Sequence, residues 1–165
     1  MPGARSVTPS RCACGTRARV ACSRGVSLQG SLTAPRAAVG VLVLRGDEVL
    51  LVLRRNAPAK GLWAVPGGSI VLGESFAQAA EREVREETGV EVRAGKVVHA
   101  FDVIERDAKG AVLHHYVVVD VMGEWMSGEP RAADDALDAR WHRVVDVDRL
   151  AISGETLRLI RRLAD

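Results

Sequence analysis

Three carboxylates stand close together in the sequence at a spacing that suits metal chemistry. Glu83, Glu86 and Glu87 occupy positions i, i+3 and i+4, which an α-helix places on one face. Like charges at these spacings repel one another by roughly 0.2–0.5 kcal/mol per pair in a helix. A positive partner should therefore lie among them, and a divalent cation with oxygen ligands satisfies that requirement.

The segment that carries these carboxylates has the start and stop signals of a helix. Ser75 is followed three residues later by Gln78, which is the spacing of a capping box at a helix N-terminus. Gly89 is a typical C-terminal stop. The sequence therefore predicts a helix between Ser75 and Gly89.

This helix is expected to have one side that packs and one side that faces solvent. Around the axis, the three glutamates continue the line of the apolar residues that precede them, Phe76, Ala79 and Ala80. The opposite side, which we expect to be solvated, carries Gln78, Glu81, Arg82 and Arg85. Carboxylates on a packing side need a metal, a buried partner or a shifted pKa. The spacing therefore favours a metal site over the alternative of an ordinary solvated face with i,i+4 charge pairs.

Residues 1–35 have the composition of a disordered basic leader. Residues 1–36 contain six arginines and no acidic residue, which leaves 17 basic and 21 acidic residues, a net charge of −4, for the rest of the chain. The overall charge of +2 therefore gives no reason to expect a nucleic-acid partner. The leader is disordered, precedes a later true start, or serves as an organelle transit peptide.

All three cysteines, Cys12, Cys14 and Cys22, lie in this leader. A zinc site usually needs four ligands in spaced pairs, so this set is incomplete, and a disulfide framework does not fit a domain without cysteines. No apolar run approaches the roughly 18 residues that span a bilayer. We expect a cytoplasmic protein with no membrane partner, or an organelle protein if the leader is a transit peptide.

Residues 36–165 have the signals of one α+β domain. Short apolar runs bounded by turn residues predict strands at residues 38–45, 48–55, 62–65, 97–104, 111–122 and 139–145. Tight turns are expected at 46–47 and 107–110, and Pro66 should end the third strand. A closing helix is expected at 154–163. Because strands and helices do not alternate regularly, we predict an α+β domain with a mixed sheet.

The segment from Gly68 to Val90 resembles the signature of the Nudix hydrolase superfamily. That signature is Gly, five residues, Glu, seven residues, Arg-Glu, an apolar residue, any residue, Glu-Glu, any residue, Gly and an apolar residue. The chain matches it at Gly68, Glu74, Arg82, Glu83, Val84, Glu86, Glu87, Gly89 and Val90. There is no departure over 23 residues. The resemblance covers about residues 36–165 and leaves the leader unexplained.

The resemblance implies an α/β/α sandwich around a mixed sheet, with the signature as a loop–helix–loop. It also implies hydrolysis of a nucleoside diphosphate linked to another moiety, in a nucleotide sugar such as ADP-ribose or in a nucleoside triphosphate. By the same resemblance, Mg²⁺ or Mn²⁺ would be held by Glu83, Glu86, Glu87 and the Gly68 carbonyl. Arg82 would position a glutamate of the signature, and Glu74 would support the loop or a metal.

The catalytic base is left open by the sequence. Glu86 or Glu83 can serve, and so can a carboxylate outside the signature, for which the polar segment before Trp141 offers Glu129, Asp134, Asp135 and Asp138. Two basic residues that end the second strand, Arg54 and Arg55, and one that follows it, Lys60, are candidates for binding phosphate. If the strand alternates there, only one of the two arginines faces the site.

The substrate is not fixed by the signature. The chain as a whole resembles small MutT-like and ADP-ribose pyrophosphatase-like proteins. The expected partner is therefore a small nucleotide-type diphosphate. A homodimer is possible. Two other functions remain open. One is an RNA 5′-pyrophosphohydrolase, in which the basic leader holds RNA. The other is a non-catalytic ligand sensor, against which the complete set of carboxylates argues.

Overall fold

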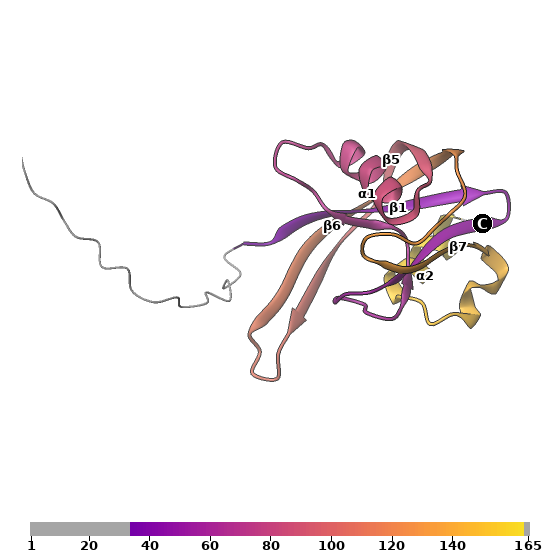
Figure 1. The fold of residues 1–165 in the computed structure, drawn as a ribbon. Helices are drawn as coiled ribbons and strands as arrows, with labels where there is room; N and C mark the ends of the chain where they lie inside the picture. Colours follow the sequence, from indigo (N-terminus) through magenta and orange to yellow (C-terminus); the bar gives the residue numbers. More distant parts are fainter. Residues whose placement is uncertain (1–33, 164–165) are drawn as a thin grey trace, which may run out of the picture. The chain divides into compact units, whose positions relative to one another are not determined.

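The computed structural model describes residues 34–163, and Figure 1 shows their arrangement. The first 33 residues of the predicted leader, with the three cysteines, lie outside the described residues. The elements, in chain order, are β1 Arg36–Arg45, β2 Glu48–Arg54, β3 Trp63–Ala64, β4 Gly67–Ser69, α1 Phe76–Thr88, β5 Glu91–Arg106, β6 Val112–Ser127, β7 Ala136–Arg143, the 3-10 helix η1 Val144–Arg149 and α2 Gly154–Leu163.

The strands form one mixed sheet, as the sequence predicted. Its main path runs β3-β2-β1-β6-β5, with β4 paired to β1 and β7 paired to β2. The β1 and β6 strands are parallel, and the other pairs are antiparallel. The β1–β2 hairpin pairs only beside its turn, at Leu44↔Val49 and Arg45↔Glu48. Beyond that point the two strands take different partners, so the sheet is open between them.

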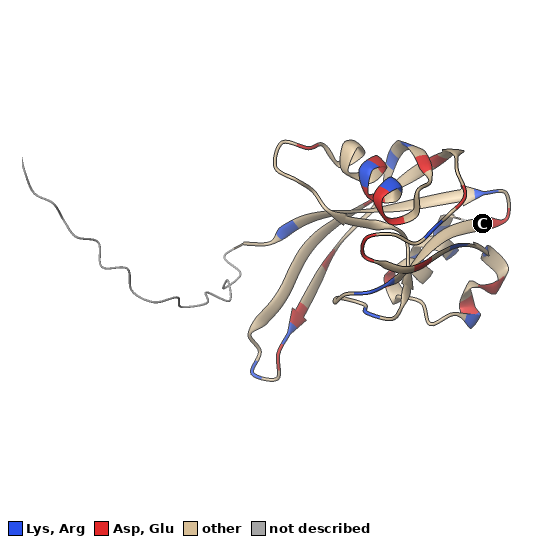
Figure 2. Cartoon of the chain, viewed as in Figure 1, with Lys and Arg blue, Asp and Glu red and all other residues tan. Residues whose placement is uncertain are grey.

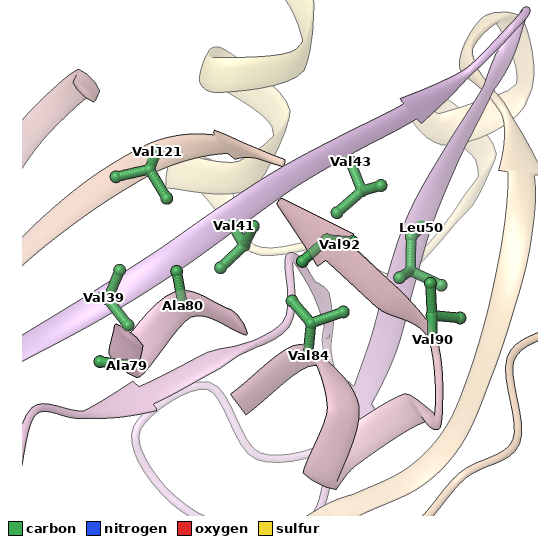
Figure 3. Close-up of a cluster of buried hydrophobic side chains, with 10 residues drawn as sticks. All are labelled: Val39, Val41, Val43, Leu50, Ala79, Ala80, Val84, Val90, Val92 and Val121. Carbon is green, nitrogen blue, oxygen red and sulfur yellow. The ribbon is translucent and has the colours of Figure 1, made fainter. Parts of the chain in front are cut away.

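Helices cover both faces of this sheet, which confirms the predicted sandwich. Because successive side chains of a strand point to opposite faces, β1 contributes to two separate cores. On one face, Ala79, Ala80 and Val84 of α1 pack against a valine-rich cluster (Figure 3) that also contains Val39, Val41, Val43, Leu50, Val90, Val92 and Val121. On the other face, η1 and α2 join the cluster Leu42, Val49, Leu51, Val147, Leu159 and Ile160.

Most predicted elements are confirmed, but two strands are longer than predicted and one short strand was not predicted. The expected strands at 97–104 and 111–122 are longer, because irregularities in the β5–β6 register carry the ladder past Gly95 and Lys96. The third strand ends before Pro66, at Ala64, as predicted, but the sequence did not predict the strand that follows. Gly67–Ser69 forms β4, which pairs with β1 at Ala38↔Ser69 and Gly40↔Gly67. A three-residue strand of this composition has no sequence signal of its own.

The predicted faces of α1 are correct in part. Ala79 and Ala80 are fully buried, whereas Phe76 is 44% exposed, contrary to the expectation. A helical pattern gives the angle around the axis and not the position along it, and only residues from Ala79 onward reach the core. Within residues 34–163 no helix is both long enough and apolar enough to cross a membrane.

The close approach of β4 to β1 yields a stability prediction. A Cβ at Gly67, whose φ is 155°, would lie 2.1 Å from the Val39 carbonyl oxygen, a backbone atom that cannot swing away. We expect Gly67→Ala to lower the free energy of unfolding by at least about 2–3 kcal/mol, measured by chemical denaturation. Gly154→Ala is the control, because nothing lies within 4 Å of its added Cβ. Equal stabilities of the two variants would contradict this packing.

Candidate active site

The ends of α1 are fixed by the residues that the sequence singled out. The Ser75 Oγ accepts a hydrogen bond from the Gln78 backbone N–H at 3.2 Å, and the Ser75 N–H donates to the Gln78 side-chain oxygen at 3.0 Å. Gly89 is left-handed, with φ 70°, and its N–H donates to the Arg85 carbonyl at 2.8 Å. This capping sets where the helix begins and ends, and therefore which residues face β4.

Arg82 is the centre of a charged network between α1 and the loop before it. Its Nε and Nη2 donate to the two carboxylate oxygens of Glu74, both at 2.8 Å. Its Nη1 donates to Glu83 at 2.8 Å and to Glu86 at 3.0 Å, and Nη2 also reaches the Ser69 carbonyl at 3.1 Å. The expectation that Arg82 lies on a solvated face is therefore wrong, since its side chain is only 22% exposed. Figure 2 shows acidic and basic residues close together along this helix.

Glu74 is held in the loop as well as by Arg82. It also accepts the Val71 backbone N–H at 3.0 Å. The hydrogen bonds from Arg82 and Val71 lower the pKa of Glu74 to about 2. A carboxylate that stays ionised and bonded in this way fits the predicted role of supporting the loop.

Two other carboxylates of the signature lie close to the glycines of β4. Glu87 is 3% exposed and accepts the Gly67 N–H at 3.0 Å, and burial raises its pKa to about 7. The Glu83 carboxylate lies against Gly68, where an added Cβ would be 2.5 Å from it. Burial raises the pKa of Glu83 too, although Arg82 opposes the rise. For both groups, burial thus outweighs the nearby positive charges that favour the ionised form.

These groups line one end of a pocket of about 710 Å³. Among the predicted carboxylates outside the signature, Asp134 and Asp135 also line it. The structure does not bring the other two to the pocket. Asp138 pairs with Arg140 at 2.7 Å, and Glu129 pairs with Arg45 at 2.7 Å.

Of the three basic candidates, the structure likewise brings only some to the pocket. Arg54 lines the pocket, and its charge is close enough to Glu87 to lower the pKa of that group. Its Nε donates to the Pro58 carbonyl at 3.2 Å, which holds the guanidinium at the pocket. Arg55 and Lys60 are exposed and do not line the pocket. Only one of the two adjacent arginines faces the site, as strand alternation requires.

The donor chemistry of this end of the pocket suits a hard divalent cation. All the candidate ligands are oxygens, which Mg²⁺, Mn²⁺ and Ca²⁺ prefer. Glu83, Glu86, Glu87, Asp134 and Asp135 gather there, with few cations to balance them. In residues 34–163 no three acidic, His or Cys side chains already converge in a ligating arrangement. Arg82 bridges Glu83 and Glu86 instead.

The same pocket is lined by a residue that the sequence did not single out. Asp120 on β6 is 3% exposed and also lines the pocket. Burial raises the pKa of Asp120 to about 6; His99 opposes the rise and Glu155 adds to it. The sequence does contain a signal for this position, because Asp120 is the one charged residue in the apolar run at 117–122.

The chain belongs to the NUDIX domain family, whose sequence model matches residues 34–163. The ADP-ribose pyrophosphatase of Methanocaldococcus jannaschii is 32% identical over 123 residues, which are 74% of this chain and 70% of that protein. The family and this relative confirm that the chain is a Nudix pyrophosphohydrolase. Nudix hydrolases in general need divalent metal ions, and the oxygen ligands at this pocket agree with that requirement.

Two solved structures share the fold. The MutT NUDIX hydrolase from Burkholderia pseudomallei is 28% identical, with a TM-score of 0.68, over 79% of this chain and 98% of that one. The NUDIX domain of Shewanella oneidensis NrtR, solved with ADP ribose, is 27% identical, with a TM-score of 0.61, over 79% and 87%. The predicted sandwich architecture is thereby confirmed.

The buried Asp120 carboxyl yields a prediction about stability and pH. Its pKa is about 6 in the folded protein and 3.8 in the unfolded chain, so its ionisation disfavours the fold as pH rises between these values. Asp120→Asn should raise the free energy of unfolding at about pH 7, by up to about 3 kcal/mol. The gain should vanish at about pH 3, where the carboxyl is protonated in both states. Thermal unfolding that shows the same gain at both pH values would contradict this origin.

Proposed function

We propose that this protein hydrolyses the diphosphate linkage of a nucleoside diphosphate joined to another moiety, with nucleotide sugars such as ADP-ribose as the leading substrate class. Nucleoside triphosphates are the second class. The observation that carries the proposal is a pocket lined both by carboxylates with Arg54 and Arg82 and by apolar and aromatic side chains of β5 and β6. The ADP-ribose pyrophosphatase relative and the neighbour solved with ADP ribose support the substrate class.

The proposed cofactor is Mg²⁺ or Mn²⁺, held by Glu83, Glu86 and Glu87 with the Gly68 carbonyl. When bound, a divalent cation neutralises phosphate charge and makes a bound water more acidic. Without it, a pocket end this rich in carboxylates would repel an anionic diphosphate. Arg54 adds a guanidinium at the same end, which is placed to contact a phosphate oxygen.

The residues of the chain have distinct roles in this proposal. Arg82 holds Glu83 and Glu86 in a fixed orientation, because each accepts from the same Nη1 atom. Glu86 has the more exposed side chain of the two, 46% against 12%, so it is the more accessible base for an attacking water. Asp134 and Asp135 are the alternative bases, since both line the pocket from the opposite loop.

A substitution at Glu86 tests the site. Glu86→Gln should lower kcat by about 10²–10⁴-fold, the usual contribution of a general base, while the circular dichroism spectrum and melting temperature stay unchanged. Glu91→Gln makes the same charge change at an exposed position outside the pocket, so it should retain activity. Near-normal turnover of Glu86→Gln would remove Glu86 from the site.

A substrate screen tests the reaction itself. The purified full-length chain should release nucleoside monophosphate from ADP-ribose in the presence of Mg²⁺ or Mn²⁺, and EDTA should abolish the release. The panel should include nucleoside triphosphates, oxidised ones among them, diadenosine polyphosphates and capped RNA. Capped RNA as the only substrate would instead favour the RNA 5′-pyrophosphohydrolase. No release from any compound would favour the ligand sensor. The cytoplasmic location and the possible homodimer remain predictions from the sequence.

A further inference from the structure

Two successive strand pairings connect Asp120 to the part of the pocket that the carboxylates line. Asp120 on β6 pairs with Gly40 on β1, and Gly40 pairs with Gly67 on β4. The Gly67 N–H in turn donates to Glu87. Adjacent strands are about 4.8 Å apart, so Asp120 and Gly67 are separated by roughly 10 Å, a distance that one nucleoside can bridge.

The Asp120 carboxylate has no donor from the protein. Within residues 34–163 its oxygens accept no side-chain or loop hydrogen bond, and although the residue is 3% exposed they are not among the fully enclosed unpaired polar atoms, so they keep contact with the open space of the pocket. An ionised carboxylate can only accept, and a buried one without a donor is costly. Gly40 makes the position possible, because an added Cβ there would be 2.2 Å from the Asp120 Oδ1. The chain therefore maintains an unpaired acceptor that faces the pocket.

The wall beside this acceptor is apolar and partly aromatic. Tyr116 and Val118 precede Asp120 at a spacing of two on β6, so their side chains share its face of the sheet. Their partners on β5, Phe101 and Val103, line the pocket with them. Such a wall suits a planar heterocycle with an apolar face, whereas a ribose alone would leave this surface without a matching partner.

We propose that Asp120 determines specificity by accepting a hydrogen bond from an amino group on the nucleobase of the substrate. The proposal rests on the proposed function, since it places the base at one end of the pocket and the diphosphate at the other. Adenine, guanine and cytosine carry an amino group, and uracil and hypoxanthine do not. The residue is remote from the carboxylate end, so it acts in recognition and not in the bond-breaking step.

Binding of nucleoside monophosphates, the products of the reaction, tests this proposal. Two matched pairs differ by one amino group: AMP against purine riboside 5′-monophosphate, and GMP against IMP. By isothermal titration calorimetry the wild type should prefer the amino member of at least one pair by about 10- to 100-fold, the usual value of a hydrogen bond to a charged group. The pair that shows the preference identifies adenine or guanine as the base.

Two variants should remove this preference by different routes. Asp120→Ala deletes the acceptor. Gly40→Ala leaves residue 120 an aspartate but displaces its carboxylate. Both should bind the two members of each pair about equally. With ADP-ribose or the corresponding guanine compound as substrate, the loss in Asp120→Ala should fall on KM rather than on kcat, because a base contact acts equally in the ground and transition states.

The outcomes separate this inference from the proposed function. If the wild type hydrolyses a diphosphate substrate but binds both members of each pair equally, the role of Asp120 is wrong and the proposed function stands. The same holds if Asp120→Ala weakens all four monophosphates to the same extent. If the wild type hydrolyses nothing yet shows an amino preference that Asp120→Ala abolishes, the recognition role stands and the proposed function fails.

Discussion

The site depends on the hydrogen bonds of one guanidinium. Arg82 bonds Glu74, Glu83, Glu86 and the Ser69 carbonyl, and so links the loop after β4 to the middle of α1. An arginine has five N–H donors in a planar fork, so it can hold several carboxylates that would otherwise repel one another. Removing this half-buried guanidinium would leave Glu74, Glu83 and Glu86 without their shared positive partner. The positions of the Glu83 and Glu86 carboxylates therefore follow from Arg82.

The second constraint is the absence of side chains at three glycines. Gly67 lets β4 approach the Val39 carbonyl, Gly68 leaves room for the Glu83 carboxylate, and Gly40 leaves room for Asp120. Each of these contacts would be closer than 3 Å with a Cβ present. The backbone of the sheet thus lies directly against the carboxylates of the candidate site. These close contacts are made by strands, which are rigid, and not by loops. Such placement holds a constellation more firmly than flexible connections would.

The sequence predicted the parts that depend on local pattern. The capping residues Ser75 and Gln78, the stop at Gly89 and the spacing of the glutamates all act within one helix, so periodicity and known preferences were sufficient. The burial of Arg82 escaped prediction, because its acceptors Glu74 and Ser69 lie in the preceding loop and at the end of β4. Local pattern does not show how that loop folds back on the helix.

Other features depend on strand partners that are distant in sequence. The choice of Asp134 and Asp135 over Asp138 follows from the path of the loop before β7, which no spacing rule gives. The isolated charge of Asp120 in its apolar run gains a structural meaning when Gly40 is placed beside it. In the sequence it is a single acidic residue in an apolar strand, which has many ordinary explanations.

The central claim is that the carboxylates of α1 bind a divalent cation, and Mn²⁺ affinity measured by electron paramagnetic resonance, without substrate, tests it most directly. The wild type should bind Mn²⁺, and Glu83→Gln should weaken binding by at least about tenfold, as expected for loss of a charged ligand. Asp138→Asn, which removes a charge outside the pocket, should bind as the wild type does. Equal Mn²⁺ affinity of the wild type and Glu83→Gln would contradict the account.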